Sequence, residues 1–206
     1  MAVAMDARPD AARPWIESAR PSYPCLIDRD HRVAELYHMV NVPQAVWIDE
    51  TGRIVRPTES AGAYEGFRAM DRATRKVPDE VAAVTAQAKR TYVDAVRDWV
   101  LRGPASAHAF DPAQAIARLV LPDERVALAH AHFRLGQHLL RQGKEGEADE
   151  QFREARRLHP DSWNIWRQTA RIDARGLASG PEFWVRVDAL GSRRYYAPVD
   201  MEGMPD

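Results

Sequence analysis

Cys25 is the residue whose chemistry is most informative, because it is the only cysteine among the 206 residues of the chain. A lone cysteine cannot form an internal disulfide, and no Cys-x-x-Cys motif is present for a dithiol cycle. A reactive thiol needs a helix N-terminus or a neighbouring cation that lowers its pKa. Cys25 instead opens the apolar run 25–27, which predicts an inert thiol packed in a buried strand. Cys25 is therefore only a weak catalytic candidate.

The seven histidines show no metal-site spacing. No two of them are four residues apart. His130 and His132 point to different sides of a helix, and so do His132 and His138. The chain also has no Gly-rich phosphate loop and no Gly-x-Ser-x-Gly motif. The sequence therefore predicts no metal site and no cofactor.

One row of polar residues is a candidate binding groove on a helix expected at about 161–175. Its members share one helix face and are Asn164, Arg167, Arg171 and Arg175. Arginines in a row can hold a carboxylate or an acidic peptide. A solvated helix face is the simpler interpretation, because surface charge is common.

The composition is typical of a globular protein, with 45% hydrophobic and 29% charged residues and a net charge of -1. This balance favours neither nucleic acid nor an anionic membrane as a partner. No apolar run approaches the roughly 20 residues that cross a bilayer, and no secretory signal opens the sequence. A cytoplasmic location is expected, and an export signal upstream of Met1 is left open.

The residue pattern predicts an α/β part over residues 1–57. Strands are expected at 2–5, 25–27, 45–48 and 53–55, with helices at 9–19 and 31–39. This alternation favours a partly parallel sheet.

A linker at 58–77 and a helical part over 78–206 follow. Pro78 begins a long helix that ends at Gly103, and Asp111 and Asp123 cap the next two. A capping helix is expected at about 181–190, followed by an irregular surface tail from Tyr195 onward.

Residues 132–160 carry the small and apolar residues of a helical repeat. They are Leu135, Gly136, Leu139, Gly143, Ala148, Phe152, Ala155 and Pro160. This segment resembles the tetratricopeptide (TPR) repeat, and Trp166 falls 34 residues after His132 at the matching place in a following repeat. The resemblance covers about 129–175 and implies antiparallel helices that bind protein or peptide partners.

The N-terminal part carries a second set of motifs, Tyr23-Pro-Cys-Leu-Ile-Asp28 and Asn41-Val-Pro-Gln-Ala-Val-Trp-Ile-Asp49, followed by Gly52-Arg-Ile-Val55. Together they resemble thioredoxin-like proteins of the TlpA/ResA redoxin type. The resemblance implies a cis-proline at Pro43, with the Val42 backbone placed to dock a peptide. The strand, helix and cysteine pair that precede these motifs in that family have no counterpart here, so the resemblance implies a truncated sheet.

Three functions remain open from these patterns. The first is a redoxin-family protein without a redox pair that acts as a protein-binding scaffold through its TPR-like region. The second is a thiol-disulfide oxidoreductase or peroxiredoxin-like enzyme that uses Cys25 or a catalytic segment upstream of Met1. The third is a fragment without function.

The missing strand also predicts how the chain closes its core. We expect the strand at Val3 to pair antiparallel with the strand at Val46, or its unpaired edge to recruit a second copy of the chain. The helix that carries Tyr92, Val96 and Trp99 should pack against the sheet or the repeat helices.

Overall fold

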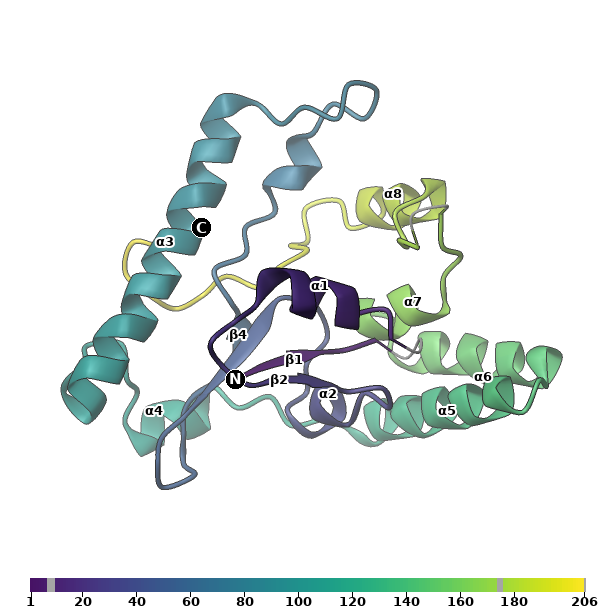
Figure 1. Cartoon of the computed structure of the whole chain (residues 1–206), viewed down its shortest axis with the longest axis horizontal. Helices are drawn as coiled ribbons and strands as arrows, with labels where there is room; N and C mark the ends of the chain where they lie inside the picture. The colour runs from purple at the N-terminus through teal and green to yellow at the C-terminus, as the bar shows by residue number, and fades with distance from the viewer. Residues whose placement is uncertain (7–9, 174–175, 206) are drawn as a thin grey trace. The chain divides into compact units, whose positions relative to one another are not determined.

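The computed structural model describes residues 1–6, 10–173 and 176–205 of the chain (Figure 1). Its strands are β1 (Ala2–Ala4), β2 (Cys25–Ile27), β3 (Gln44–Ile48) and β4 (Ile54–Ser60). Its α-helices are α1 (Arg13–Ala19), α2 (Arg32–Leu36), α3 (Asp79–Arg102), α4 (Pro112–Ala117), α5 (Glu124–Arg141), α6 (Glu145–Leu158), α7 (Trp163–Thr169) and α8 (Pro181–Asp188). The expected order of an α/β part followed by helices is therefore confirmed in this coarse sense. None of the described helices is long and apolar enough to cross a membrane.

The strands form two separate two-stranded sheets in the described part of the chain. β1 pairs with β2 in parallel, so that Val3 lies opposite Leu26, and β3 pairs with β4 in antiparallel. The predicted pairing of the strands at Val3 and Val46 is therefore wrong. The physical reason is local, because α1 connects β1 to β2 as a crossover and places β2 beside β1.

The contacts divide the chain into two compact units that differ from the expected domains. Unit 1 consists of residues 1–40 and 120–171, and unit 2 consists of residues 41–119 and 172–206. Each unit thus combines a two-stranded sheet with helices from the later part of the chain.

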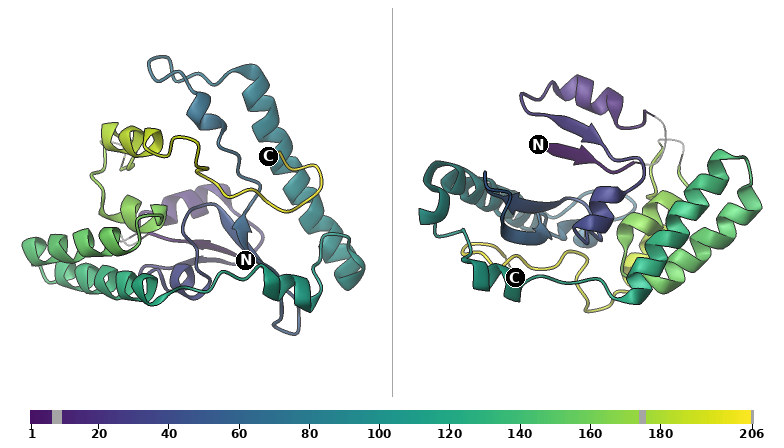
Figure 2. Two further views of the ribbon diagram at one scale, coloured as in Figure 1. Left: turned by 180° about the vertical axis from the view of Figure 1, so that it is seen from behind. Right: turned by 90° about the horizontal axis from the view of Figure 1, so that it is seen from below.

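Unit 1 is built on the antiparallel hairpin of α5 and α6, which Figure 2 shows from two further directions. Asp123 caps α5 by accepting a hydrogen bond from the Val126 N–H at 2.8 Å. Gly136 allows the helices to approach closely, because a Cβ there would lie 2.5 Å from the Phe152 ring. Ala148 and Ala155 complete this buried seam with no exposed surface.

Unit 2 is built on α3, which packs against the β3–β4 sheet as predicted. Trp47 from β3 stacks on Trp99 at a ring distance of 5.1 Å and meets Tyr92 edge-on at 5.9 Å. Gly62 lies against α3, with φ +67° and a Cβ position 2.8 Å from the Tyr92 Cβ. Any other residue would be strained there, because its backbone would be left-handed and its Cβ would clash with Tyr92.

Two boundaries in unit 2 differ from the sequence prediction. β4 continues to Ser60 through Pro57, so the expected linker at 58–77 begins inside a strand. An irregular register between Ala45 and Trp47 accompanies this proline, which cannot donate to a regular ladder. The C-terminal tail is irregular, as expected, but it is not confined to the surface, because Tyr195 and Val199 are buried.

Candidate functional site

Cys25 lies in β2 and is half-buried, with its Sγ 3.8 Å from the Tyr23 carbonyl oxygen. The neighbouring Leu26 is about half exposed, so this strand is less buried than the sequence predicts. The chain has no second thiol with which Cys25 could pair.

The Val42–Pro43 peptide bond is cis, which is the isomer that the redoxin resemblance implies. Both backbone groups of Val42 already have partners within the chain. Its N–H donates to the Asn41 Oδ1 at 2.9 Å, and its carbonyl accepts from the Tyr196 hydroxyl at 3.2 Å. A peptide that pairs with Val42 must therefore replace these contacts.

The predicted arginine row does not form one helix face. Asn164 is buried in α7, Arg167 is half-buried, and Arg171 is exposed beyond the end of the helix at Thr169. Arg175 lies outside the described residues.

The early end of α7 has a clear cause. The Thr169 hydroxyl donates to the Ile165 carbonyl at 2.9 Å, and Arg156 donates to both the carbonyl and the hydroxyl of Thr169. These bonds satisfy the C-terminal groups of α7 and replace a further helical turn.

Amide side chains of α5 and α7 hold the backbone of residues 29–40, a stretch that we call the docked segment. Asn164 donates from Nδ2 to the Met39 carbonyl at 2.8 Å, and its N–H donates to the Val40 carbonyl at 3.1 Å. Gln137 donates to the Arg29 carbonyl at 3.3 Å. Such bonds are made to the main chain and therefore do not depend on the sequence of the docked segment.

Two arginines of α5 bind carboxylates of the docked segment. Arg134 forms an ion pair with Glu35, and Arg141 forms one with Asp30 at 3.0 Å. The first pair is partly buried and the second is more than half exposed, so the first has the lower solvent screening. The helical surface therefore contacts two carboxylates of a segment that also carries Arg29 and Arg32, with Arg32 itself paired to Glu35 at 2.8 Å.

Four histidines meet where the docked segment contacts α5 and the end of α6. His38 stacks on His159 at a ring distance of 5.9 Å, and His130 meets His159 at 6.1 Å. His31 contacts the Phe133 ring edge-on at 5.2 Å. All but His38 are buried.

A hollow of about 290 Å³ lies beside this cluster in unit 1. Its lining includes two imidazoles, a guanidinium, two carboxylates and apolar side chains. These are His38, His159, Arg125, Asp123, Asp161, Val120, Leu121, Val126 and Leu158, with Pro122 and Pro160. Within the described parts of the chain, no three His, Cys, Asp or Glu side chains are grouped so that they could hold a metal ion.

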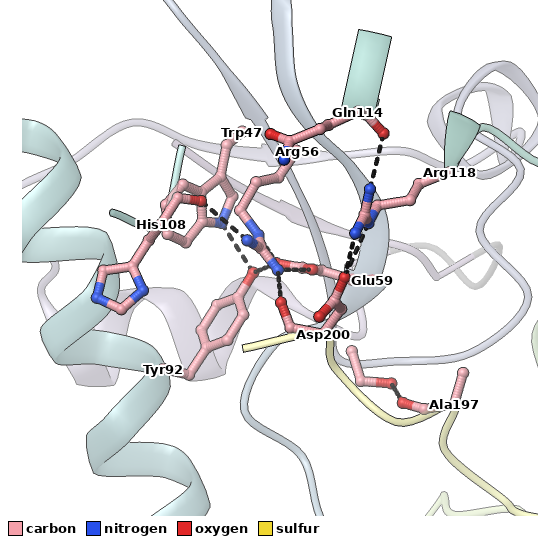
Figure 3. A network of polar contacts seen from close by, with 10 residues as sticks. Trp47, Arg56, Glu59, Tyr92, His108, Gln114, Arg118, Ala197 and Asp200 are labelled. Atoms are coloured by element: carbon pink, nitrogen blue, oxygen red, sulfur yellow. Dashed lines mark hydrogen bonds and ion pairs between the residues drawn. The ribbon is translucent and has the colours of Figure 1, made fainter. Parts of the chain in front are cut away.

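Unit 2 contains a buried ion pair between Arg56 and Glu59 (Figure 3). The Arg56 guanidinium donates to both Glu59 carboxylate oxygens, at 2.9 and 2.8 Å. It also donates to the backbone carbonyls of His108 and Asp200, both at 2.9 Å. Its plane lies over the Phe110 ring at 4.1 Å, so the charge is enclosed on several sides.

Tyr92 extends this network toward the sheet. Its hydroxyl donates to Glu59 at 2.9 Å and accepts from the Trp47 indole at 2.8 Å. Burial, together with the charge of Glu59, raises the Tyr92 pKa, so the hydroxyl stays protonated. The network ties β3, β4, α3 and the tail together, and its satisfied donors indicate a structural role.

The sequence analysis missed both the histidine cluster and the Arg56 network. Their members come from elements far apart in the sequence, and helical spacing tests only neighbours on one element. The sequence did contain one sign of the Arg56 network. Arg56 stands between Val55 and Pro57 in an apolar strand, and a charge that is buried in such a strand needs an ionic or hydrogen-bond partner.

Comparison of the chain with protein-family models, with curated proteins and with solved structures finds no match.

Proposed function

We propose that this chain is a non-enzymatic protein-binding scaffold. Its α/β part is thioredoxin-like, of the TlpA/ResA redoxin type but without its own redox-active cysteine pair, and its TPR-like helices hold polypeptide. The β1–α1–β2 unit and the β3–β4 hairpin directly after Pro43 support the first assignment. The buried Gly136, Ala148 and Phe152 at the α5–α6 seam support the second.

One observation carries the binding function, namely the way α5 and α7 hold the docked segment. Gln137 and Asn164 bind backbone carbonyls, while Arg134 and Arg141 bind carboxylates. The main-chain bonds lie on either side of α2 and need no particular side chain of the ligand, and arginine adds a preference for acidic residues. The proposed ligand is therefore an acidic segment of a partner protein that competes with the docked segment.

An added peptide must compete with the docked segment, which is part of the same chain and therefore acts at a high effective concentration. The protein used is the whole chain with Asp30→Asn and Glu35→Gln, because these changes weaken the ion pairs of the docked segment. This variant is called the host. The probe is a labelled peptide of sequence 28–40, compared with the same peptide in which Asp30 and Glu35 are neutralised. Fluorescence anisotropy should show roughly tenfold tighter binding of the acidic peptide.

Adding Arg134→Ala and Arg141→Ala to this host should abolish the preference for the acidic peptide. Arg157→Ala is the matched control, because Arg157 is an exposed arginine of α6 that pairs with Glu154. Equal binding of the two peptides, or no binding of either, would contradict the proposed function.

A further inference from the structure

The four histidines lie on the two sides of a single contact. His31 and His38 flank α2 in the docked segment, whereas His130 belongs to α5 and His159 follows α6. The His31 Nε2 and the His38 Nδ1 are buried and have no hydrogen-bond partner among the described residues. A proton added to either nitrogen would therefore become a buried donor without an acceptor.

Several charged groups face these imidazoles from the neighbouring elements. Asp28, Asp30 and Asp6 face His31, and Asp123 faces His38. These carboxylates favour the protonated imidazoles, but burial opposes protonation more strongly in both cases. The pKa of His31 and that of His38 are therefore lowered.

The helix side shows the same balance. Glu35 favours protonation of His130, while burial, Arg134 and the other histidines oppose it and lower its pKa. Burial lowers the pKa of His159 to about 4, and the nearby His130 and His38 add to this effect against Asp161 and Asp123. All four imidazoles are therefore neutral at pH 7.

We propose that the four histidines form an acid-sensitive latch whose protonation releases the docked segment from α5–α7. Protonation places like charges on both sides of one contact, with the His38 and His159 rings 5.9 Å apart. The released state solvates these charges, so acid favours it over the closed state. This inference does not depend on the proposed function, since it concerns only the chain's own segment.

Hydrogen exchange of the whole chain tests the latch. Between pH 7 and pH 5, after correction for the intrinsic exchange rate, protection of amides in residues 29–40 should fall at least roughly tenfold. Amides of α3 in unit 2 serve as the internal control and should keep their protection. Unchanged protection of residues 29–40, or an equal loss in α3, would overturn the proposal.

The matched variant is His31→Asn with His38→Asn. Both residues have left-handed backbones, with φ of 54° and 51°, which asparagine tolerates well. This variant keeps His130 and His159, so it should reduce the pH dependence of exchange in the docked segment without removing it, and a full pH dependence would contradict the latch. If it does not fold, His159→Gln replaces it with the same expectation.

A proton NMR titration of the unaltered chain gives a measurement that needs no variant. The four histidines of the latch should titrate below pH 6.5, with His159 near pH 4. Titration of these four near pH 6.5 would refute the latch.

Discussion

Arg56 shows what a single buried charge requires. Its side chain is 1% exposed and meets Glu59, two backbone carbonyls and an aromatic ring. Replacing it with methionine leaves the Glu59 carboxylate without its main partner in a buried site. We expect Arg56→Met to lower the free energy of unfolding by roughly 3–5 kcal/mol, measured by urea denaturation.

Two controls separate charge from volume in this prediction. Arg157→Ala removes an exposed ion pair and should cost less than about 1 kcal/mol. The double variant Arg56→Met with Glu59→Gln should recover part of the stability, because no charge is then left unpaired. A double variant less stable than Arg56→Met alone would show that the unpaired Glu59 charge is not the cause of the destabilisation.

The single thiol leads to a prediction about activity. Disulfide reduction by a dithiol cycle needs two cysteines close enough to bridge, and this chain has only Cys25. The chain should therefore show no insulin reduction above background. Activity that disappears in Cys25→Ser would support the oxidoreductase alternative instead.

At the scale of single residues, the sequence was informative where the residue type alone decides the outcome. The chain has a single cysteine, so an internal disulfide is excluded, and Asp123 was correctly predicted to cap α5. The partners of Arg56 and His159 could not be predicted, because they depend on tertiary contacts between distant segments.

Among the elements, the α5–α6 hairpin depends on one close approach. Gly136→Ala would place a methyl group against the Phe152 ring and should destabilise the chain by roughly 1–3 kcal/mol. Gly146 in α6 is the matched control, because, beyond its chain neighbours and the adjacent α6 backbone, no atom of the described residues lies within 4 Å of its Cβ position. Gly146→Ala should be neutral or stabilise by roughly 0.5–1 kcal/mol, since alanine has the higher helix propensity. Thermal melts of both variants that gave equal shifts would contradict this packing.

The elements best predicted from the sequence were the long helices α3 and α5, in which apolar residues recur with the helical period. Asp123 caps the start of α5, and Gly103 marks the end of α3. Those poorly predicted end through side-chain contacts from elsewhere. α7 stops at Thr169 because Arg156 binds its last groups, and β4 runs through Pro57 because its ladder is irregular there. Neither cause can be read from local propensity.

For the whole molecule, acid should reduce stability through His159. The folded-state pKa of about 4 lies below the model value of 6.5, so the unfolded chain binds more protons at low pH. The stabilising effect is complete above pH 6.5 and is lost as the pH falls toward 4. Between pH 6.5 and pH 5, protonation linked to His159 should lower the free energy of unfolding by roughly 2 kcal/mol.

Chemical denaturation at several pH values checks this sign. His159→Gln should flatten the fall in stability between pH 6.5 and 5. A variant at least as pH-dependent as the unaltered chain would show that His159 is not responsible. His132→Gln is the control, because His132 lies on α5 outside the four-histidine cluster and contacts Gln151 at 2.7 Å.

The interleaved units predict what happens when the chain is divided. Separate pieces 1–76 and 77–206 each contain only parts of both units. Neither piece should fold alone, and mixing them should restore a cooperative melt followed by circular dichroism. Two pieces with independent cooperative transitions would contradict this.

The same interleaving has a consequence for synthesis on the ribosome. The docked segment emerges early, but α5 and α7, which bind its carbonyls and carboxylates, are translated only after most of unit 2. At roughly 5–20 residues per second this delay lasts several seconds. During that time the carbonyls and carboxylates of the nascent segment have no native partner to bind. A chaperone that holds nascent chains would meet this stretch before its own helices do.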